Sequence, residues 1–350
     1  MRPAILISDV LVLFFGTLLM LTPAITRPTV QFGVRVPPER IGAPVLRDQR
    51  RAYYRRAGAI VICSTAIAFA LADHGSWWLP KIMLLVELAA ELGCFLLARR
   101  KIVAVKNAER WFAGLRQTVV ADTSWRTDPP RFPVRWLVPA LTVIAATAAV
   151  GAVRAAGPRP VIGIVTGEVY VTAVWTGLLL LFFRARPEVE ASDPAASVRR
   201  YRRFLGAFAR AMLTLVALVD LTLLLSALRA WHVYRPGGVG ADLPAVPFIV
   251  GLLVLAVVTV RTGQGGHRLP VATLGAARAP AAGVDRDDDR FWKCGVIYLN
   301  RDDPALMVGA RIGVGFSLNV GNPAAWLIIA FAVAAPTGLT VLFYGLGLVH

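Results

Sequence analysis

The sequence predicts an all-α integral membrane protein with about eight transmembrane helices and a small β-containing cytoplasmic module before the last helix. Three observations predict this fold. The 350-residue chain is 57% hydrophobic with a mean hydropathy of +0.62, which lies far outside the range of soluble domains. Its apolar stretches are long enough to cross a hydrocarbon core of about 30 Å as helices. Most of its 38 Lys and Arg residues lie in alternate loops between those stretches.

The apolar stretches are interpreted as spanning helices in chain order. The first contains one charge, Asp9, and is too long, with too many spans after it, to be a cleaved signal peptide. Trp77, Trp78 and Trp231 fall at one predicted membrane interface, and Trp136 lies at the other. The predicted spans are 3–25, 57–72, 79–98, 136–153, 161–183, 204–228, 245–260 and 323–349.

The alternation of basic loops predicts the orientation of the chain. Arginine-rich loops stay on the cytoplasmic side of a bacterial inner membrane, so both termini are expected outside. Arg2 favours the opposite placement of the N-terminus, but the arginines between residues 26 and 56 outweigh it. The net charge of +17 is therefore a topology signal and does not indicate nucleic-acid binding. The expected partners are the lipid bilayer and anionic lipids of its inner leaflet; no protein partner is indicated.

The cytoplasmic segments differ from one another. Residues 99–117 carry apolar positions at helical spacing, so the third helix is expected to continue past the membrane. After the helical bundle of 1–260, the segment 261–288 reads as a flexible linker rich in Gly, Ala and Pro. Residues 289–323 contain β-rich runs and turn signals, which predict a small hairpin-like module before the last helix, 323–350.

This module carries a sequence pattern, W-K-x-G-x-x-Y-x-N-x-D-D-P, followed by G-x-G-x-x-x-N ahead of an apolar helix. The pattern resembles the C-terminal module of uncharacterised bacterial multi-pass membrane proteins, known as domain of unknown function 5808. The matching residues are Trp292, Lys293, Gly295, Tyr298, Asn300, Asp302, Asp303, Pro304, Gly313, Gly315 and Asn319.

Three other stretches resemble the same proteins: FGVRVPPE at 32–39, ADTSWRTDPPRF at 121–132 and RTGQGGHRL at 261–269. Such proteins often carry domain of unknown function 1648, which is related to the sporulation-delaying-protein immunity family and marked by a proline-histidine loop. The connector at 154–163 contains no histidine, so the chain departs from that pattern. The resemblance implies no catalytic residues.

Five acids lie inside the predicted spans, where an ionised carboxylate costs about 2.5–3.5 kcal/mol to insert. Glu87 and Glu91 are four residues apart and share a helix face, whereas the other three fall in the outer halves of their spans. These acids could form a proton- or cation-coupled site or a pocket for a cationic ligand. Alternatively, they make buried contacts to Arg or hydroxyl partners, which is the favoured interpretation. The candidate residues are Asp9, Glu87, Glu91, Glu168 and Asp220.

Nothing in the sequence supports enzymatic catalysis, a cofactor or a metal site. Cys63, Cys94 and Cys294 form no CxxC pair, and GQGG lies outside any βαβ unit. The acidic run at 285–289 lacks the glycine and terminal glutamate of a calcium loop, so it is interpreted as solvated or paired with arginines. The preferred hypothesis is a non-enzymatic protein for envelope sensing, regulation or immunity-like protection. The alternative is a proton- or cation-coupled secondary transporter.

Overall fold

Long helices dominate the computed structural model, which describes residues 13–70, 79–118, 127–185, 189–190, 193–234, 243–270, 284–332 and 334. Residues 13–20 are helical and lead into the short helix α2 (Thr22–Ile25). The longer helices are α3 (Pro44–Ala70), α4 (Leu79–Ala108), α6 (Val138–Arg154), α7 (Pro158–Arg184), α8 (Pro194–Ala230), α9 (Val246–Thr262) and a C-terminal helix (Pro323–Ala332).

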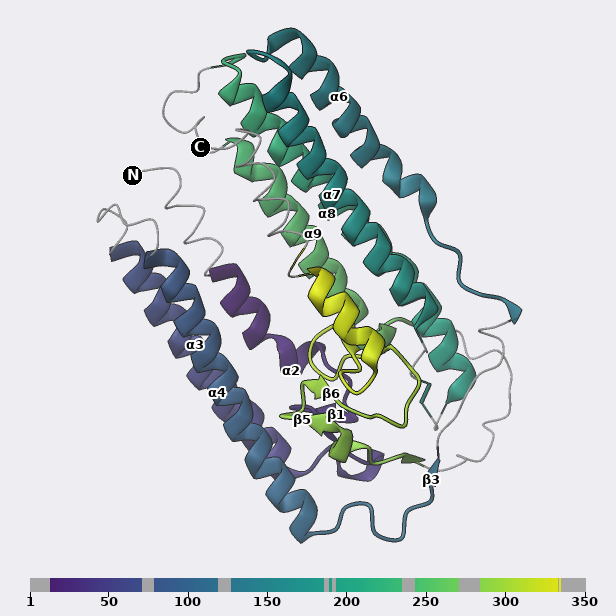
Figure 1. Ribbon diagram of the computed structural model, residues 1–350. Helices are drawn as coiled ribbons and strands as arrows, with labels where there is room; N and C mark the ends of the chain where they lie inside the picture. Colours follow the sequence, from purple (N-terminus) through teal and green to yellow (C-terminus); the bar gives the residue numbers. More distant parts are fainter. Residues whose placement is uncertain are drawn as a thin grey trace.

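Helices α3 and α4 pack side by side as one unit (Figure 1). Their shared core contains Tyr53 from α3, and Phe95 and Ile102 from α4. Phe32, which precedes α3, inserts between them, with ring centroids 5.3 Å from Tyr53 and 5.5 Å from Phe95. The sequence-based prediction that the third helix continues past residue 98 is confirmed, because α4 runs without interruption to Ala108.

Helix α8 lies at the centre of the second unit and packs against α6, α7 and α9. It starts at Asp193, whose Oδ1 accepts a hydrogen bond from the backbone N–H of Ala196 at 3.2 Å, with Pro194 in the first turn. Buried side chains recur on more than one face, including Phe204 and Leu205, as expected for a helix surrounded by others.

The strands in the described part of the chain form four two-stranded sheets. The first hairpin joins β1 (Val30–Gln31) to β2 (Val34–Arg35) through Phe32 and Gly33, whose φ angles of 50° and 69° match a two-residue type I′ turn. The predicted hairpin-like module is confirmed as two antiparallel hairpins, whereas the sequence did not predict strands around residue 32. The other pairs are β3 (Gln117–Thr118) with β4 (Val284–Asp285), β5 (Trp292–Lys293) with β6 (Ile297–Tyr298), and β7 (Met307–Gly309) with β8 (Phe316–Leu318).

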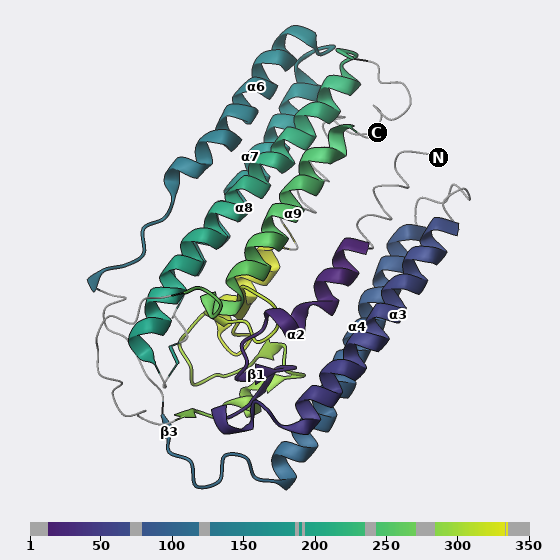
Figure 2. The ribbon, with the colours of Figure 1, turned by 180° about the vertical axis from the view of Figure 1, so that it is seen from behind.

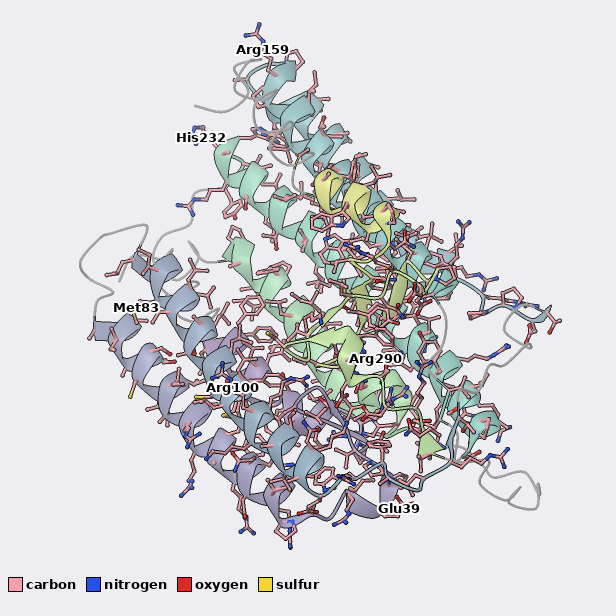
Figure 3. The ribbon with its side chains drawn as sticks, turned by 60° about the horizontal axis from the view of Figure 1, so that its bottom comes forward. Glu39, Met83, Arg100, Arg159, His232 and Arg290 are labelled. Carbon is pink, nitrogen blue, oxygen red and sulfur yellow. The ribbon has the colours of Figure 1, made fainter. Side chains whose placement is uncertain are left out.

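The short strands gather at one end of the helices, between α4 and the ends of α8 and α9 (Figures 1 and 2). We call the hairpins β1–β2, β5–β6 and β7–β8 together the inner module. Arg159 and His232 lie at the opposite end of the molecule from Glu39 and Arg290 (Figure 3). The described residues at 159 and 232, predicted outside, therefore lie away from the end that holds residue 39, which is predicted inside.

Among the described residues, four helical segments are long and apolar enough to cross a membrane: Val134–Arg154, Pro158–Arg184, Pro194–Ala230 and Leu243–Gly266. They correspond to the fourth to seventh predicted spans. Helices α3 and α4 are equally long but more polar, since α3 begins with arginines and α4 carries Lys81, Glu87 and Glu91. The first span lies partly, and the eighth largely, outside the described residues.

Candidate functional site

Asn319 is the centre of the inner module and is fully buried. Its side-chain Nδ2 donates to the carbonyl oxygens of Asn300, Asp303 and Ala305 at 2.9, 3.0 and 3.1 Å. Its Oδ1 accepts from the backbone N–H of Asn300 at 3.0 Å and of Gly321 at 3.1 Å. A single amide side chain thus holds the turn after β6 against the end of β8.

The aromatic and acidic motif residues complete this hub. Tyr298 donates its hydroxyl to Asp303 Oδ2 at 2.9 Å, and the Tyr298 ring lies 5.1 Å from the ring of Trp292. Asp303 Oδ1 and Asn300 Oδ1 each accept a backbone N–H two residues later, as is usual in such turns. Lys293, Asp302 and Pro304 are exposed.

Four positions with positive φ shape the loops of the module. Cys294 and Gly295, at 53° and 74°, form the turn between β5 and β6, and Gly313 and Gly315, at 64° and 125°, lie between β7 and β8. All the motif residues therefore lie in one folded unit, and most of them have a structural role there.

A family of unknown function, DUF5808, matches residues 301–326. The matched segment covers the turn after β6, the β7–β8 hairpin and the start of the C-terminal helix. No curated protein and no solved structure matches the chain. The match supports the predicted resemblance for this segment, whereas the relation to domain of unknown function 1648 and to immunity proteins has no support from it.

The turn of β1–β2 packs directly against the turn of β5–β6. A Cβ atom added to Gly33 would lie 2.5 Å from the carbonyl oxygen of Gly295, so only glycine permits this contact. Arg99, from α4, donates to the Gly33 carbonyl at 2.6 Å and to the Trp292 carbonyl at 3.5 Å. Two stretches singled out in the sequence, around residues 32 and 295, are thus joined through α4.

A buried cluster of charges lies beside these turns. Arg311, which is 3% exposed, pairs with Asp288 and Asp289, and its Nη1 donates to the Gly33 carbonyl at 3.0 Å. Its guanidinium carbon lies 5.0 Å from the Trp292 ring centroid. The whole cluster contains the cations Arg35, Lys106 and Arg311 and the carboxylates of Asp285, Asp287, Asp288 and Asp289.

Lys106 and Arg35 attach the acidic run to α4 and β2. Lys106 Nζ lies 2.8 Å from Asp287 Oδ1 and 2.6 Å from Asp289 Oδ2, and the backbone N–H of Arg35 donates to Asp289 Oδ1 at 2.9 Å. Burial alone would raise the pKa of Asp289, but Arg311, Lys106 and the Arg35 N–H outweigh it and lower that pKa below its ordinary value. Asp289 is therefore ionised in the folded protein at neutral pH.

Two family-like stretches remain. Residues 121–126 of the stretch 121–132 lie outside the described residues, whereas the stretch 261–269 lies on the side of α8. Gln264 accepts from the backbone N–H of Arg27 at 3.0 Å and donates its side-chain amide to the Ala310 carbonyl. A Cβ atom added to Gly266 would lie 2.5 Å from the Arg200 carbonyl of α8. Within the predicted linker, residues 264–266 form the 3₁₀ helix η5 and residues 284–285 form β4, while 271–283 lie outside the described residues.

The partly buried His267, in the stretch 261–269, gives a pH prediction. Burial lowers the pKa of His267 from 6.5 to about 4; the Gln264 carbonyl opposes this shift, and Arg27, Arg268 and Arg200 reinforce it. Between pH 6.5 and 4 the histidine is protonated in the unfolded chain but not in the folded protein. The free energy of unfolding must therefore decrease as the pH is lowered through this range. We expect the thermal midpoint of the detergent-solubilised protein to drop from pH 7.5 to pH 5, and to drop less in His267→Gln.

The control for this prediction is His232→Asn, because His232 is exposed and has a positive φ of 56° that asparagine tolerates. This variant should retain the wild-type loss of stability in acid. Equal acid sensitivity of wild type and His267→Gln would contradict the assignment.

The described acids of the predicted spans divide between the two helix units. In the second unit, Thr147 of α6 lies 2.8 Å from Glu168 Oε1 on α7, and Thr172 of α7 donates to Asp220 Oδ2 on α8 at 2.8 Å. Both acids are fully buried, and each keeps one oxygen without a hydrogen bond. The hydroxyl contacts fit the favoured interpretation of buried polar contacts between helices.

Glu87 and Glu91 lie in the first unit and are each 1% exposed. Their carboxylate oxygens have no hydrogen-bond partner among the described residues. Asp9 lies outside the described residues, so only Glu168 and Asp220 of the expected outer group can be placed, and their helices, α7 and α8, pack together. The described part of the chain contains no group of three or more possible metal ligands.

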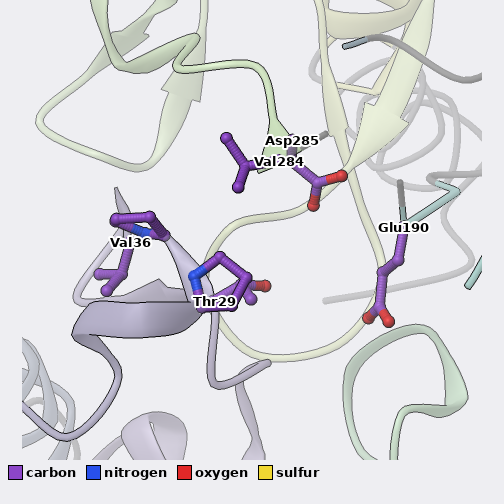
Figure 4. Close-up of a pocket in the computed structure, with 7 residues that line it drawn as sticks. Thr29, Val36, Glu190, Val284 and Asp285 are labelled. Carbon is purple, nitrogen blue, oxygen red and sulfur yellow. The ribbon is translucent and has the colours of Figure 1, made fainter. Parts of the chain in front are cut away.

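A small pocket opens beside the module, between the segment after β2, Glu190 and β4 (Figure 4). Its acidic lining residues are Glu190 and Asp285, and Arg27 lies 4.0 Å from Glu190. The pocket has room for about one water molecule. It is therefore too small to hold an organic substrate.

Sequence reasoning missed the cations that hold the module. Arg35, Arg99, Lys106 and Arg311 were not among the candidates, although an arginine in a glycine-rich loop and an acidic run before the motif were visible. Those signals indicate pairing, but they do not indicate which of many arginines is the partner.

Proposed function

We propose that the chain is a non-enzymatic, multi-pass protein of a bacterial inner membrane that couples its two helix units through the inner module. Its role is in envelope sensing, regulation or immunity-like protection. In this proposal α3 and α4 also span the membrane, together with the segments 3–25 and 323–349, which gives eight spans. The basic loops and the module face the cytoplasm, and both termini face outside.

The membrane placement is supported by the apolar surface of the helices. In the most apolar segments of α6 and α7, only 17% of the residues are buried within the structure. Large apolar side chains such as Leu141, Ile162 and Leu180 are exposed. Soluble proteins rarely leave contiguous apolar surfaces of this extent in water. Lipid is the solvent that such helices require.

The observation that carries the coupling proposal is that the module contacts both helix units. On one side, Arg99 of α4 donates to the Gly33 carbonyl of β1–β2, and Lys106 of α4 pairs with the acidic run that precedes β5. On the other, the Phe316 ring of β8 stacks on Phe182 of α7 at 4.5 Å, and Gln264 binds the β7–β8 hairpin at Ala310. A movement of either unit therefore acts on the module.

The functional test is genetic. Deleting the gene in its source bacterium should alter survival under envelope stress, and the wild-type gene should restore it. A Lys106→Met variant should not restore it despite normal membrane abundance, because two carboxylates lose their α4 partner. The exposed Lys101→Met is the matched control. Restoration by Lys106→Met, or the absence of any envelope phenotype, would count against this function.

A second candidate is proton- or cation-coupled transport, which the buried acids favour. Thr147 Oγ1 lies 3.0 Å from the Val143 carbonyl as well as 2.8 Å from Glu168. Its single hydroxyl proton can serve only one of these acceptors, so the geometry has a place for a proton on Glu168. A site that gains and loses a proton inside a bundle is what coupled transport requires.

This candidate predicts that proteoliposomes containing the wild-type protein dissipate an imposed pH gradient and that Glu168→Gln does not. The isosteric amide keeps the contact to Thr147 and removes the exchangeable charge. Glu39→Gln, at an exposed loop site, is the control. Gradients that decay at the rate of protein-free liposomes would reject transport and leave the coupling proposal standing.

A further inference from the structure

The exposed face of α3 carries a ladder of like charges. Arg47, Arg51 and Arg55 follow one another at four-residue spacing, and all three are exposed. Like charges at this spacing destabilise a helix. Asp48, the single acid in α3, forms no ion pair with them, and no carboxylate of the described residues lies within salt-bridge distance. Within the described residues the ladder is therefore an exposed surface of positive charge that an anion outside the chain could neutralise.

Most of the described acids grouped near this end of the molecule are paired with other cations. Asp287, Asp288 and Asp289 face the buried cations of the inner module, and Glu109 pairs with Arg40 at 3.0 Å. The acidic run, which could have neutralised the arginine ladder, instead neutralises Lys106 and Arg311. The periphery of α3 and α4 keeps its positive charge.

The exposed surfaces of α3 and α4 change from basic to apolar at the same height along the two helices. Beyond Arg56, the outer face of α3 presents Ile62 and Ile67, which are 71% and 45% exposed. On α4 the change occurs between Leu97, which is 48% exposed, and the exposed Arg100. Because Tyr53 and Ala57 of α3 share a core with Phe95 and Ala98 of α4, the two changes lie side by side.

From this arrangement we infer that the basic face of α3 and α4 binds the phosphate headgroups of anionic phospholipids, whose acyl chains cover the adjoining apolar face. The inference rests on the proposed membrane placement of this helix pair. At about 1.5 Å per residue, Arg55 lies about 6 Å below Ala59, the first apolar position of that face, and Arg51 about 12 Å below it. The headgroup layer is roughly 5–8 Å thick on each side, so the Arg55 backbone lies within it. The Arg51 backbone lies a few Å beyond it, and its long side chain can extend back toward the headgroups.

The test uses the purified full-length protein in detergent, titrated with short-chain phosphatidylglycerol or phosphatidylcholine and followed by native mass spectrometry. Phosphatidylglycerol should bind preferentially, and Arg51→Gln/Arg55→Gln should weaken its binding by roughly ten- to thirtyfold. Arg51→Lys/Arg55→Lys should keep the affinity within about threefold, because lysine retains the charge. The charge-matched control is Arg154→Gln/Arg159→Gln, at the other end of the helices. This variant should bind phosphatidylglycerol with the wild-type affinity.

Three results would overturn the inference: equal binding of the two lipids, no loss in Arg51→Gln/Arg55→Gln, or the same loss in the control. Free glycerol phosphate, added in competition, should not displace the lipid at millimolar concentration, since it lacks the acyl chains. Displacement by it would identify a site for a soluble anion and reject the lipid. The assay needs no physiological activity, so its failure is distinct from failure of the genetic test.

Discussion

Arg311→Met is expected to destabilise the inner module more than any other single loss of charge. The substitution removes the partner of Asp288 and Asp289, the hydrogen bond to the Gly33 carbonyl and the contact with the Trp292 ring. The side chains of Asp288 and Asp289 are 26% and 18% exposed, so leaving them without their buried cation should cost roughly 1–3 kcal/mol. The loss should be smaller at low pH, where the aspartates can take up protons.

The measurement is limited proteolysis of the detergent-solubilised protein, combined with its thermal midpoint. Cleavage should appear between residues 284 and 322 in Arg311→Met while the helices stay protected. Arg301→Met is the matched control, because Arg301 is exposed in the same module. Similar cleavage rates in the two variants would mean that the buried cluster does not hold the module.

Asn319→Asp is the second substitution that we expect to destabilise the inner module strongly. It replaces the side-chain amide nitrogen at the centre of the module by an oxygen. The new carboxylate oxygen would face the carbonyl oxygens of Asn300, Asp303 and Ala305, where the amide nitrogen now donates. Buried acceptors that lose their donor cost about 1–3 kcal/mol each, and the uncompensated charge adds to this. We expect the module to unfold or the aspartate to stay protonated.

Asn322→Asp supplies the contrast within three residues. Asn322 Oδ1 accepts from the backbone N–H of Ala324 at the start of the C-terminal helix, and aspartate performs this role equally well. Aspartate loses only the hydrogen bond from Asn322 Nδ2 to the Pro304 carbonyl, which is exposed to solvent, so water can replace it. Proteolysis and thermal unfolding should therefore show wild-type behaviour for Asn322→Asp and a loose module for Asn319→Asp. Two equally mild variants would refute the role of Asn319 as the hub.

The helices and the hairpins of the module were predictable because their signals are local. Apolar length predicted α6 to α9, and the turn residues around Asn300 predicted strands before and after them. The continuation of α4 to Ala108 followed from helical spacing in a charged loop. Each of these predictions needs only neighbours within a few residues.

The pairing of distant segments was not predictable, since it depends on contacts over more than 200 residues of sequence. Two examples are the hydrogen bonds from Arg311 to Gly33 and from Arg27 to Gln264. Neither contact produces a repeating sequence pattern in the segments that it joins. Pairing of the acidic run with arginines was one of the two predicted alternatives, but the structure also pairs it with a lysine, Lys106. Likewise, the hydroxyl partners of Glu168 and Asp220 come from neighbouring helices whose order a single sequence does not give.

The central claim is that the inner module holds the α3–α4 pair in a fixed position relative to α6–α9. Spin labels at Ala104 of α4 and Ala195 of α8, both exposed, would measure this directly after the three native cysteines are replaced by serine. The distance between the labels should be single and narrowly distributed in the otherwise unchanged protein, and broad in Asn319→Asp. A distribution that stays equally narrow when the module is disrupted would contradict the claim.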